Sequence, residues 1–218
     1  MGADIIFSFD ECTSPLADYN YTKKSMKRTH DWAERCLKAK KKNNQALFGI
    51  VQGGLFKDLR QESAKFIGAL PFDGFGIGGS LGKTKKTMFK ILDWTIPLLP
   101  ENKPRHLLGI GYLEDFEESI KRGVDTFDCV YPTRMARHGT AITSGGKINI
   151  KKAQFLKSKI SLDKNCSCPV CQNYTCSYLS HLIRSSEITG MRLLTLHNLY
   201  FFKKYIESIR EKIKKDEI

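Results

Sequence analysis

The segment TFDCVYPTRMARHG, residues 126–139, holds the residues of this sequence best suited to chemistry. Asp128 ends an apolar run, and Arg134 and Arg137 follow it three residues apart. A carboxylate at the end of a buried strand can act as a nucleophile or a general base. The planar guanidinium groups beyond it can bind phosphates or base edges through paired hydrogen bonds. Taken singly, Asp128 is more typical of a capping or loop-ordering acid, and each arginine is more typical of a solvated surface residue.

A second group of residues suits a metal ion. Cys166, Cys168 and Cys171 lie together in CSCPVC, a spacing that can surround a tetrahedral ion, and thiolates favour zinc. Spacing alone does not choose the fourth ligand among three candidates: Cys176, His181 and His197. A site filled by four protein ligands has no open position, which indicates a structural role. Free cysteines in a core are the alternative.

Composition favours a nucleic-acid partner. The 218 residues carry 36 Lys and Arg against 23 Asp and Glu, a formal net charge of +13, and so basic a surface suits polyanions. Basic proteins without such a partner are also common. We find neither a charged and then apolar leader nor a run of about 18 apolar residues, so we expect a cytoplasmic protein with no membrane span. The odd cysteine count of 7 disfavours a disulfide framework.

Short apolar runs alternate with longer amphipathic segments up to about residue 130, a pattern typical of β/α units around a parallel sheet. Strands are predicted at residues 3–10, 46–52, 72–79, 105–111 and 124–130. Helices are predicted between them at residues 25–41, 58–70, 83–98 and 113–122. A further helical region begins near residue 178.

A polar residue or a glycine stands near the end of every predicted strand: Asp10, Gln52, Gly79, Gly111 and Asp128. A (β/α)8 TIM barrel gathers such residues into one pocket. A doubly wound open sheet does so too, but no GxGxxG opens a first helix, and we favour the barrel. A complete barrel takes roughly 250 residues. We therefore expect a partial barrel over residues 1–150 and a zinc-binding subdomain over residues 151–218.

Seven motifs carry a resemblance to a known family: FDEC (9–12), GIVQGG (49–54), FGIGGS (75–80), LLGIG (107–111), FDCVYPTRMAR (127–137), CSCPVC (166–171) and TLHNLYFF (195–202). In this order they resemble the tRNA-guanine transglycosylases, also called queuine tRNA-ribosyltransferases. The resemblance covers nearly the whole chain. It implies a (β/α)8 barrel with a zinc-binding insertion, and an enzyme that exchanges the wobble guanine of tRNA for a 7-deazaguanine base.

The resemblance implies a role for each residue of the opening segment. Asp128 corresponds to the nucleophile that attacks the ribose C1′ carbon, expels guanine and holds the RNA covalently until the incoming base displaces it. A carboxylate suits this step because the transition state resembles an oxocarbenium ion, as in retaining glycosidases. Arg134 and Arg137 correspond to arginines that contact the anticodon loop of the tRNA beside the target guanosine.

The base pocket follows from the same resemblance. Asp10 is expected to accept hydrogen bonds from N1–H and N2–H of guanine, while Gln52 and the backbone N–H of Gly79 donate to O6. Leu108 forms a stacking wall. The ligands of one structural Zn²⁺ per chain become Cys166, Cys168, Cys171 and His197, which leaves Cys176 and His181 outside the site.

Two departures from the family pattern qualify these expectations. Ser80 and Thr84 stand where bacterial members carry a leucine and a glutamate, which leaves open which 7-deazaguanine enters. The family's N-terminal barrel strands and a second catalytic aspartate have no counterpart, so we expect dimerisation or a complementing segment to be needed. The alternatives are a truncated or accessory tRNA-binding subunit without catalysis and, less favoured, a metal-dependent barrel hydrolase.

Overall fold

The computed structural model describes residues 2–41, 44–79, 81–82 and 84–218. Ser80, which the sequence analysis considered for base selectivity, lies outside the described residues. The chain forms two compact units, residues 1–128 and 129–218, each of which is described by itself. The two compact units divide after Asp128. The domain boundary expected after residue 150 stays a prediction.

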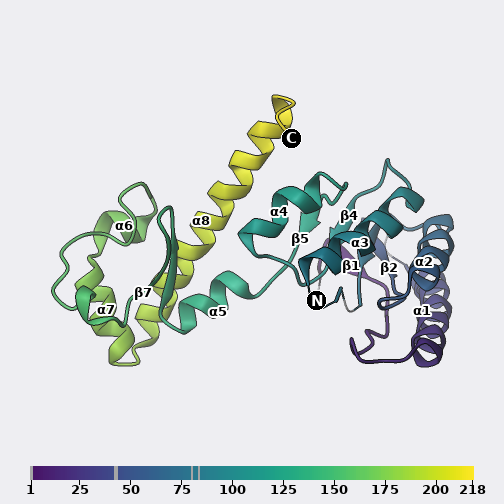
Figure 1. Ribbon diagram of the computed structural model, residues 1–218, viewed down its shortest axis with the longest axis horizontal. Coiled ribbons are helices and arrows are strands. Elements are labelled where there is room, and N and C mark those ends of the chain that lie inside the picture. The colour runs from purple at the N-terminus through teal and green to yellow at the C-terminus, as the bar shows by residue number, and fades with distance from the viewer. Residues whose placement is uncertain (1, 42–43, 80, 83) are drawn as a thin grey trace. The chain divides into compact units, whose positions relative to one another are not determined.

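The first unit contains a parallel sheet of five strands in chain order: β1 (Ile5–Phe7), β2 (Ala46–Val51), β3 (Gly74–Ile77), β4 (Arg105–Leu107) and β5 (Thr126–Phe127) (Figure 1). Every neighbouring pair is parallel. A doubly wound sheet reverses its strand order at a switch point, and this sheet does not. The unit is a curled half barrel, which confirms the predicted partial (β/α)8 fold and excludes the open-sheet alternative.

Helices connect the strands: α1 (Tyr19–Ala39), α2 (Lys57–Ala69), α3 (Lys85–Thr95) with the 3-10 turn η1 (Ile96–Leu98), and α4 (Leu113–Ile120). All four predicted helices are present. Helix α1 begins earlier than expected because Asp18 caps it, accepting a hydrogen bond from the backbone N–H of Tyr21. The helix predicted over 83–98 ends in the η1 turn at Pro97, and its first residue, Lys83, is outside the described part.

The register of the sheet decides which side chains share a face. Cross-strand partners are Ile50, Gly76, His106 and Thr126. Side chains two residues apart in a strand point the same way, so this face continues at the strand ends with Gln52, Gly78, Leu108 and Asp128. The ladder supports this continuation, because the N–H of Gly78 donates to Val51 and the N–H of Leu108 donates to Ile77. The sheet thus places the polar side chains of Gln52 and Asp128 on one face, at its carboxyl edge.

The opposite face of the sheet packs on the helices. Phe75, Ile77 and Leu107 are completely buried there, against apolar residues of α2 and α3 such as Ile67 and Ile91. Burying a side chain of this size contributes about 1.5–3 kcal/mol. The helical layer therefore holds the strands rigidly, while their other face and their ends remain available for a site.

The second unit consists of α5 (Tyr131–Arg137), the antiparallel hairpin of β6 (Thr140–Thr143) and β7 (Gly146–Asn149), the turn η2 (Ala153–Phe155), α6 (Pro169–Asn173), α7 (Cys176–Arg184) and α8 (Ile188–Lys214). The helical region predicted from residue 178 corresponds to α7 and α8. The hairpin and α5 were not predicted. The core of this unit includes Ile150, Val170 and Leu194.

Helix α8 has 27 residues, but it is amphipathic, with charged side chains along its exposed side. Its buried side includes Leu194, His197 and Asn198, and it packs against α5, α7 and β6. No helix among the described residues is both long and apolar enough to cross a membrane.

Candidate active site and metal centre

Gln52 and Asp10 form the polar centre of the predicted base pocket. The Gln52 amide donates from Nε2 to Oδ2 of Asp10 over 2.6 Å. Gln52 is only 1% exposed, and its Oε1 has no hydrogen-bond partner among the described groups. An unsatisfied buried amide oxygen is costly, and a ligand with a suitable donor would satisfy it. The pair therefore places a carboxylate and a buried amide side by side, groups that can accept and donate hydrogen bonds.

The environment of Asp10 suits a carboxylate that accepts hydrogen bonds from a ligand. Burial raises the pKa of Asp10 above its ordinary value of 3.8, and the hydrogen bond from Gln52 lowers it by less. Two further hydrogen-bond donors at this carboxylate would favour its charged form.

Glycines keep the space around Gln52 open. A Cβ at Gly78 would lie 2.7 Å from Ile50 Cγ2, 3.1 Å from Gln52 Nε2 and 3.3 Å from Leu108 Cδ1. Gly79 has φ +75°, and a Cβ there would overlap Oε1 of Gln52. The structure therefore brings Asp10, Gln52, Gly79 and Leu108 together, as their predicted shared role requires. Their binding of a base stays a prediction.

Arg60, which the sequence analysis missed, holds this pocket from behind. Its guanidinium is completely buried and donates to the carbonyl oxygens of Gly54 over 2.8 Å and Gly78 over 2.7 Å. Burial lowers the pKa of Arg60 to about 10, so it remains charged at neutral pH. It ties the segment after β2 to the segment after β3. The sequence feature that could have identified Arg60 is its position on the apolar face of α2, beside Leu59 and Ala64.

A buried pair of side chains fixes the backbone of Gln52. Ser63 Oγ accepts from the Gln52 backbone N–H over 3.0 Å and lies 3.0 Å from Nε2 of His30. Because Oγ accepts from Gln52, its own proton is free to bond to His30. Burial lowers the pKa of His30 to about 4, so its ring is neutral and can accept that proton. This chain joins α1 and α2 to the end of β2.

Asp128 lies just beyond β5, with its side chain 58% exposed. Its Oδ1 accepts from the backbone N–H of Gly109 over 2.8 Å and lies 3.0 Å from Nε2 of His106. The predicted nucleophile is therefore both accessible and anchored. His106 was not singled out from the sequence, because only the strand register places it beside Asp128.

The metal centre lies in the second unit. Nδ1 of His197 is 3.4 Å from Sγ of Cys168, 3.4 Å from Sγ of Cys171 and 3.8 Å from Sγ of Cys166. The four ligand atoms all lie within 4.8 Å of one another. Zinc bonds of about 2.0–2.3 Å in a tetrahedron separate ligand atoms by roughly 3.5–3.8 Å. The donor set and its dimensions fit a tetrahedral metal ion such as zinc.

The surroundings of these side chains also fit a cation. Burial raises the pKa of the Cys166 and Cys171 thiols, and a bound cation would favour their thiolates. Burial lowers the pKa of His197, which keeps its ring neutral. Nε2 of His197 lies 3.0 Å from the carbonyl oxygen of Ile142, to which it can donate, leaving the lone pair of Nδ1 for the metal.

The two alternative ligands lie apart from the cluster. The thiol of Cys176 is buried and donates to the carbonyl oxygen of Ser161 over 3.3 Å. His181 is exposed on α7. Neither belongs to the metal-binding group, which agrees with their exclusion by the resemblance.

Comparison with known proteins places this chain. A family profile described as Queuine tRNA-ribosyltransferase matches residues 1–218. The chain belongs to this family. The Queuine tRNA-ribosyltransferase of Halothermothrix orenii is 50% identical over 219 residues, which cover 100% of this chain and 59% of that protein. The Putative queuine tRNA-ribosyltransferase of Archaeoglobus fulgidus is 53% identical over 222 residues, covering 98% and 55% respectively.

The Queuine tRNA-ribosyltransferase of Geobacillus thermodenitrificans is 48% identical over 220 residues, covering 100% of this chain and 58% of that protein. The chain thus spans between 55% and 59% of the length of these curated relatives.

The two arginines that the family resemblance singled out lie on α5. Arg134 and Arg137 are exposed. Asn198, next to the metal ligand His197, connects α5 to the metal centre. Its Nδ2 donates to the carbonyl oxygens of Pro132 (2.9 Å) and Thr140 (3.1 Å), and its Oδ1 accepts from the N–H of Ile142 (2.9 Å).

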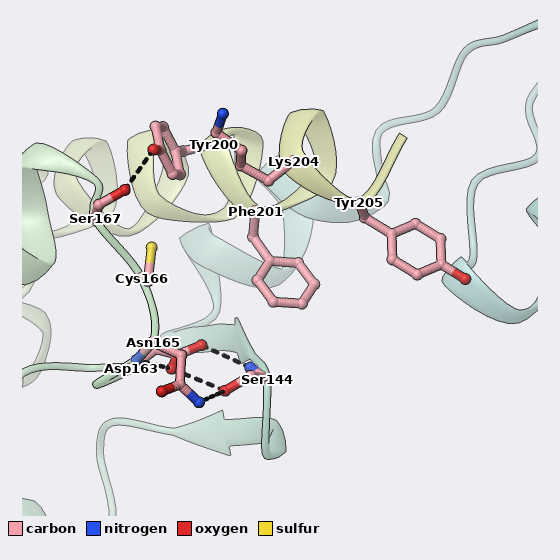
Figure 2. Close-up of a pocket in the computed structure, with 9 residues that line it drawn as sticks. All are labelled: Ser144, Asp163, Asn165, Cys166, Ser167, Tyr200, Phe201, Lys204 and Tyr205. Carbon is pink, nitrogen blue, oxygen red and sulfur yellow. Dashed lines mark hydrogen bonds between the residues drawn. The ribbon is translucent and has the colours of Figure 1, made fainter. Parts of the chain in front are cut away.

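A pocket of about 310 Å³ that was not predicted lies beside Cys166 (Figure 2). Asp163 orders its floor, accepting from the backbone N–H of Ser144 over 2.6 Å, from Oγ of Ser144 over 2.9 Å and from the N–H of Asn165 over 2.9 Å. On the side of α8, the hydroxyl of Tyr200 lies 2.8 Å from that of Ser167. These hydrogen bonds hold the loop that carries Cys166.

Proposed function

We propose that this chain supplies the nucleophile, the base-recognition groups and the RNA-binding arginines of a tRNA-guanine transglycosylase. The reaction exchanges the wobble guanine of tRNA for a 7-deazaguanine base. The observation that carries the proposal is Asp128, an exposed carboxylate anchored through one oxygen at the end of β5. Gln52 and Leu108 belong to the same face of the sheet.

The chemistry consists of two displacements at the ribose. In the first, an oxygen of Asp128 forms a bond to C1′ while the bond from C1′ to N9 of guanine breaks, and guanine leaves with the electron pair and takes up a proton from solvent. In the second, N9 of the incoming base attacks C1′ as its proton passes to solvent, and the Asp128 carboxylate leaves with the electron pair of its bond to C1′. Both transition states carry oxocarbenium character, which a neighbouring carboxylate stabilises. Two displacements retain the configuration at C1′.

Base recognition falls to Asp10, Gln52 and Gly79. The Asp10 carboxylate accepts from the N1–H and N2–H edge, a paired arrangement that adenine, which lacks both donors, cannot provide. Gln52 has a second amide proton besides the one given to Asp10, and that proton together with the Gly79 N–H can bind O6. Leu108 and the bare surface of Gly78 are suited to contact the flat ring. Such contacts offset the few kcal/mol needed to unstack the base.

Zinc has a structural role in this proposal. Cys166, Cys168, Cys171 and His197 would hold it, and four protein ligands leave no position for a substrate. The bound ion supplies folding free energy rather than chemistry. Helix α8 carries the ligand His197 and also contacts α5 through Asn198. The metal centre therefore supports α5, the helix that carries Arg134 and Arg137.

The half barrel also implies a partner for its edges. Among the described residues, β1 pairs only with β2, and β5 pairs only with β4. Open edges of parallel strands invite further pairing. We propose that a complementing segment or a second copy of this chain covers them. The same observation favours the second candidate function, an accessory tRNA-binding subunit that needs a catalytic partner.

The test is exchange of labelled guanine into an anticodon stem-loop RNA with guanine at the wobble position. The wild-type chain is compared with Asp128→Asn and with Glu101→Gln, a control at an exposed carboxylate. Exchange by the wild type and the control, but not by Asp128→Asn, supports the enzyme. RNA binding without exchange supports the accessory subunit. Exchange that survives in Asp128→Asn overturns the assignment of the nucleophile.

A further inference from the structure

His106 occupies a position between two polar groups of the neighbouring strand. It is the cross-strand partner of Thr126, and Asp128 follows two residues later on the same face. Nδ1 of His106 lies 2.8 Å from Oγ1 of Thr126, and Nε2 lies 3.0 Å from Oδ1 of Asp128. The ring of Phe7 on β1 packs beside the imidazole, with centroids 5.2 Å apart. The His106 side chain is only 12% exposed, so its orientation is fixed.

The hydrogen-bond partners determine which nitrogen carries the proton. An ionised carboxylate can only accept, so Nε2 must donate to Asp128. In a neutral ring Nδ1 then accepts, and the Thr126 hydroxyl donates to it. The backbone N–H of Gly109 donates to the same carboxylate oxygen over 2.8 Å. Oδ1 therefore has two donors, and neither of these contacts uses Oδ2.

We propose that His106 is a positioning residue that assigns different roles to the two oxygens of Asp128. This inference rests on the proposed function. Oδ2 attacks C1′, while Oδ1 stays bound to His106 and Gly109 and becomes the carbonyl oxygen of the covalent ester. His106 keeps its proton throughout. The electron pair of the C1′–N9 bond leaves with guanine, and in the second displacement the pair of the bond from C1′ to Oδ2 returns to the carboxylate.

The arrangement favours the second displacement in particular. Hydrogen bonds to a charged acceptor are stronger than those to a neutral one. His106 therefore stabilises the free carboxylate more than the ester and makes Asp128 a better leaving group. Loss of this donor should slow the release of RNA from the ester, whereas a residue that only supported the fold would have no such selective effect.

The experiment forms the adduct between the chain and a stem-loop RNA with a wobble guanine, and then adds excess guanine. In His106→Leu the adduct should decay roughly tenfold more slowly than in the wild type, since one charge-assisted hydrogen bond is lost. His106→Gln, which retains a donor, should recover part of the rate. RNA affinity should be unchanged in both variants. Decay of the His106→Leu adduct at the wild-type rate would overturn the proposal.

A second readout does not depend on activity and separates this inference from the proposed function. Nitrogen NMR of the histidine rings reports which nitrogen is protonated. His106 should show a protonated Nε2 and an unprotonated Nδ1, and Asp128→Asn should shift both this ring and the Gly109 amide. If no variant forms an adduct, the proposed function fails while this pattern can still hold. A neutral His106 protonated on Nδ1 would refute the positioning role whatever the activity.

Discussion

Nε2 of Gln52 lies 2.6 Å from Oδ2 of Asp10, so two groups expected to bind the base are joined by a hydrogen bond. The incoming base must share or replace this hydrogen bond. The free pocket is thus preorganised, and Arg60 and Ser63 hold the surrounding backbone in place.

The first prediction concerns pH and Asp10. Burial raises the pKa of this carboxyl, and the Gln52 hydrogen bond lowers it by less, so Asp10 takes up its proton at a higher pH than an ordinary aspartate. As pH falls through that raised pKa, one acceptor of the guanine edge is lost and affinity should fall by about 1.5–3 kcal/mol. Equilibrium dialysis with labelled guanine measures the profile.

Asp10→Asn is the matched control for that profile. It should bind guanine weakly and show little change with pH over the same acid range. A group whose pKa is higher in the folded state than in the unfolded state adds to folding stability below its unfolded-state pKa. This contribution is lost as the pH rises through its folded-state pKa. The variant should therefore be no less stable than the wild type at neutral pH. Identical pH profiles for the two proteins would exclude Asp10 from the base site.

The second prediction concerns the metal centre. Purified protein should contain one zinc per chain, and a strong chelator should unfold residues 129–218, because structural zinc contributes on the order of 10 kcal/mol or more. Elemental analysis and circular dichroism measure the two effects. Cys168→Ser should lose the metal, whereas Cys176→Ser should retain it. Metal loss in Cys176→Ser would show that the ligand set is wrong.

The third prediction links Asn198 to RNA binding. Asn198→Ala leaves the N–H of Ile142 and the carbonyl oxygens of Pro132 and Thr140 without this partner. Each unsatisfied buried group costs about 1–3 kcal/mol. The variant should unfold at a lower temperature and bind RNA more weakly while still holding zinc. Asn198→Asp keeps the acceptor and should be affected less. Unchanged stability and RNA affinity would show that the hydrogen bonds of Asn198 do not hold α5 in place.

The fourth prediction concerns Arg134. Arg134→Gln should weaken binding of the stem-loop RNA, and if the contact is to phosphate the slope of log affinity against log salt should decrease by about 1. Arg192→Gln, at an exposed arginine on α8, is the control and should bind normally. Filter binding over a series of salt concentrations measures both. Equal affinity of Arg134→Gln and wild type at every salt concentration would show that Arg134 does not contact the RNA.

The sequence predicted the five parallel strands and the four helices of the first unit, because apolar runs and amphipathic segments alternate clearly there. The predicted strands were too long. Residues 108–111, for example, continue the apolar run of β4 beyond the strand itself, which ends at Leu107. The strand ends are where the backbone turns to form the site, so local periodicity overestimates regular structure there.

Residues that support the site were harder to predict than residues that form it. Asp128 stands in a motif, but His106 acquires its place only through its pairing with Thr126 in the parallel register. Asn198 lies 56 residues from Ile142, to which it bonds. Such contacts depend on how distant segments pack, which no single stretch of sequence reveals. The hairpin of β6 and β7 was missed for a related reason, because its strands are short and one of them is mostly exposed.

The most direct test of the central claim is a covalent bond between Asp128 and RNA. The chain is incubated with a stem-loop RNA that carries a wobble guanine, separated on a denaturing gel, and digested for mass spectrometry. The wild type should give a slower band that maps to the peptide containing Asp128 and decays when excess guanine is added, and Asp128→Asn should give none. An adduct that persists in Asp128→Asn, or that maps to another residue, would contradict it.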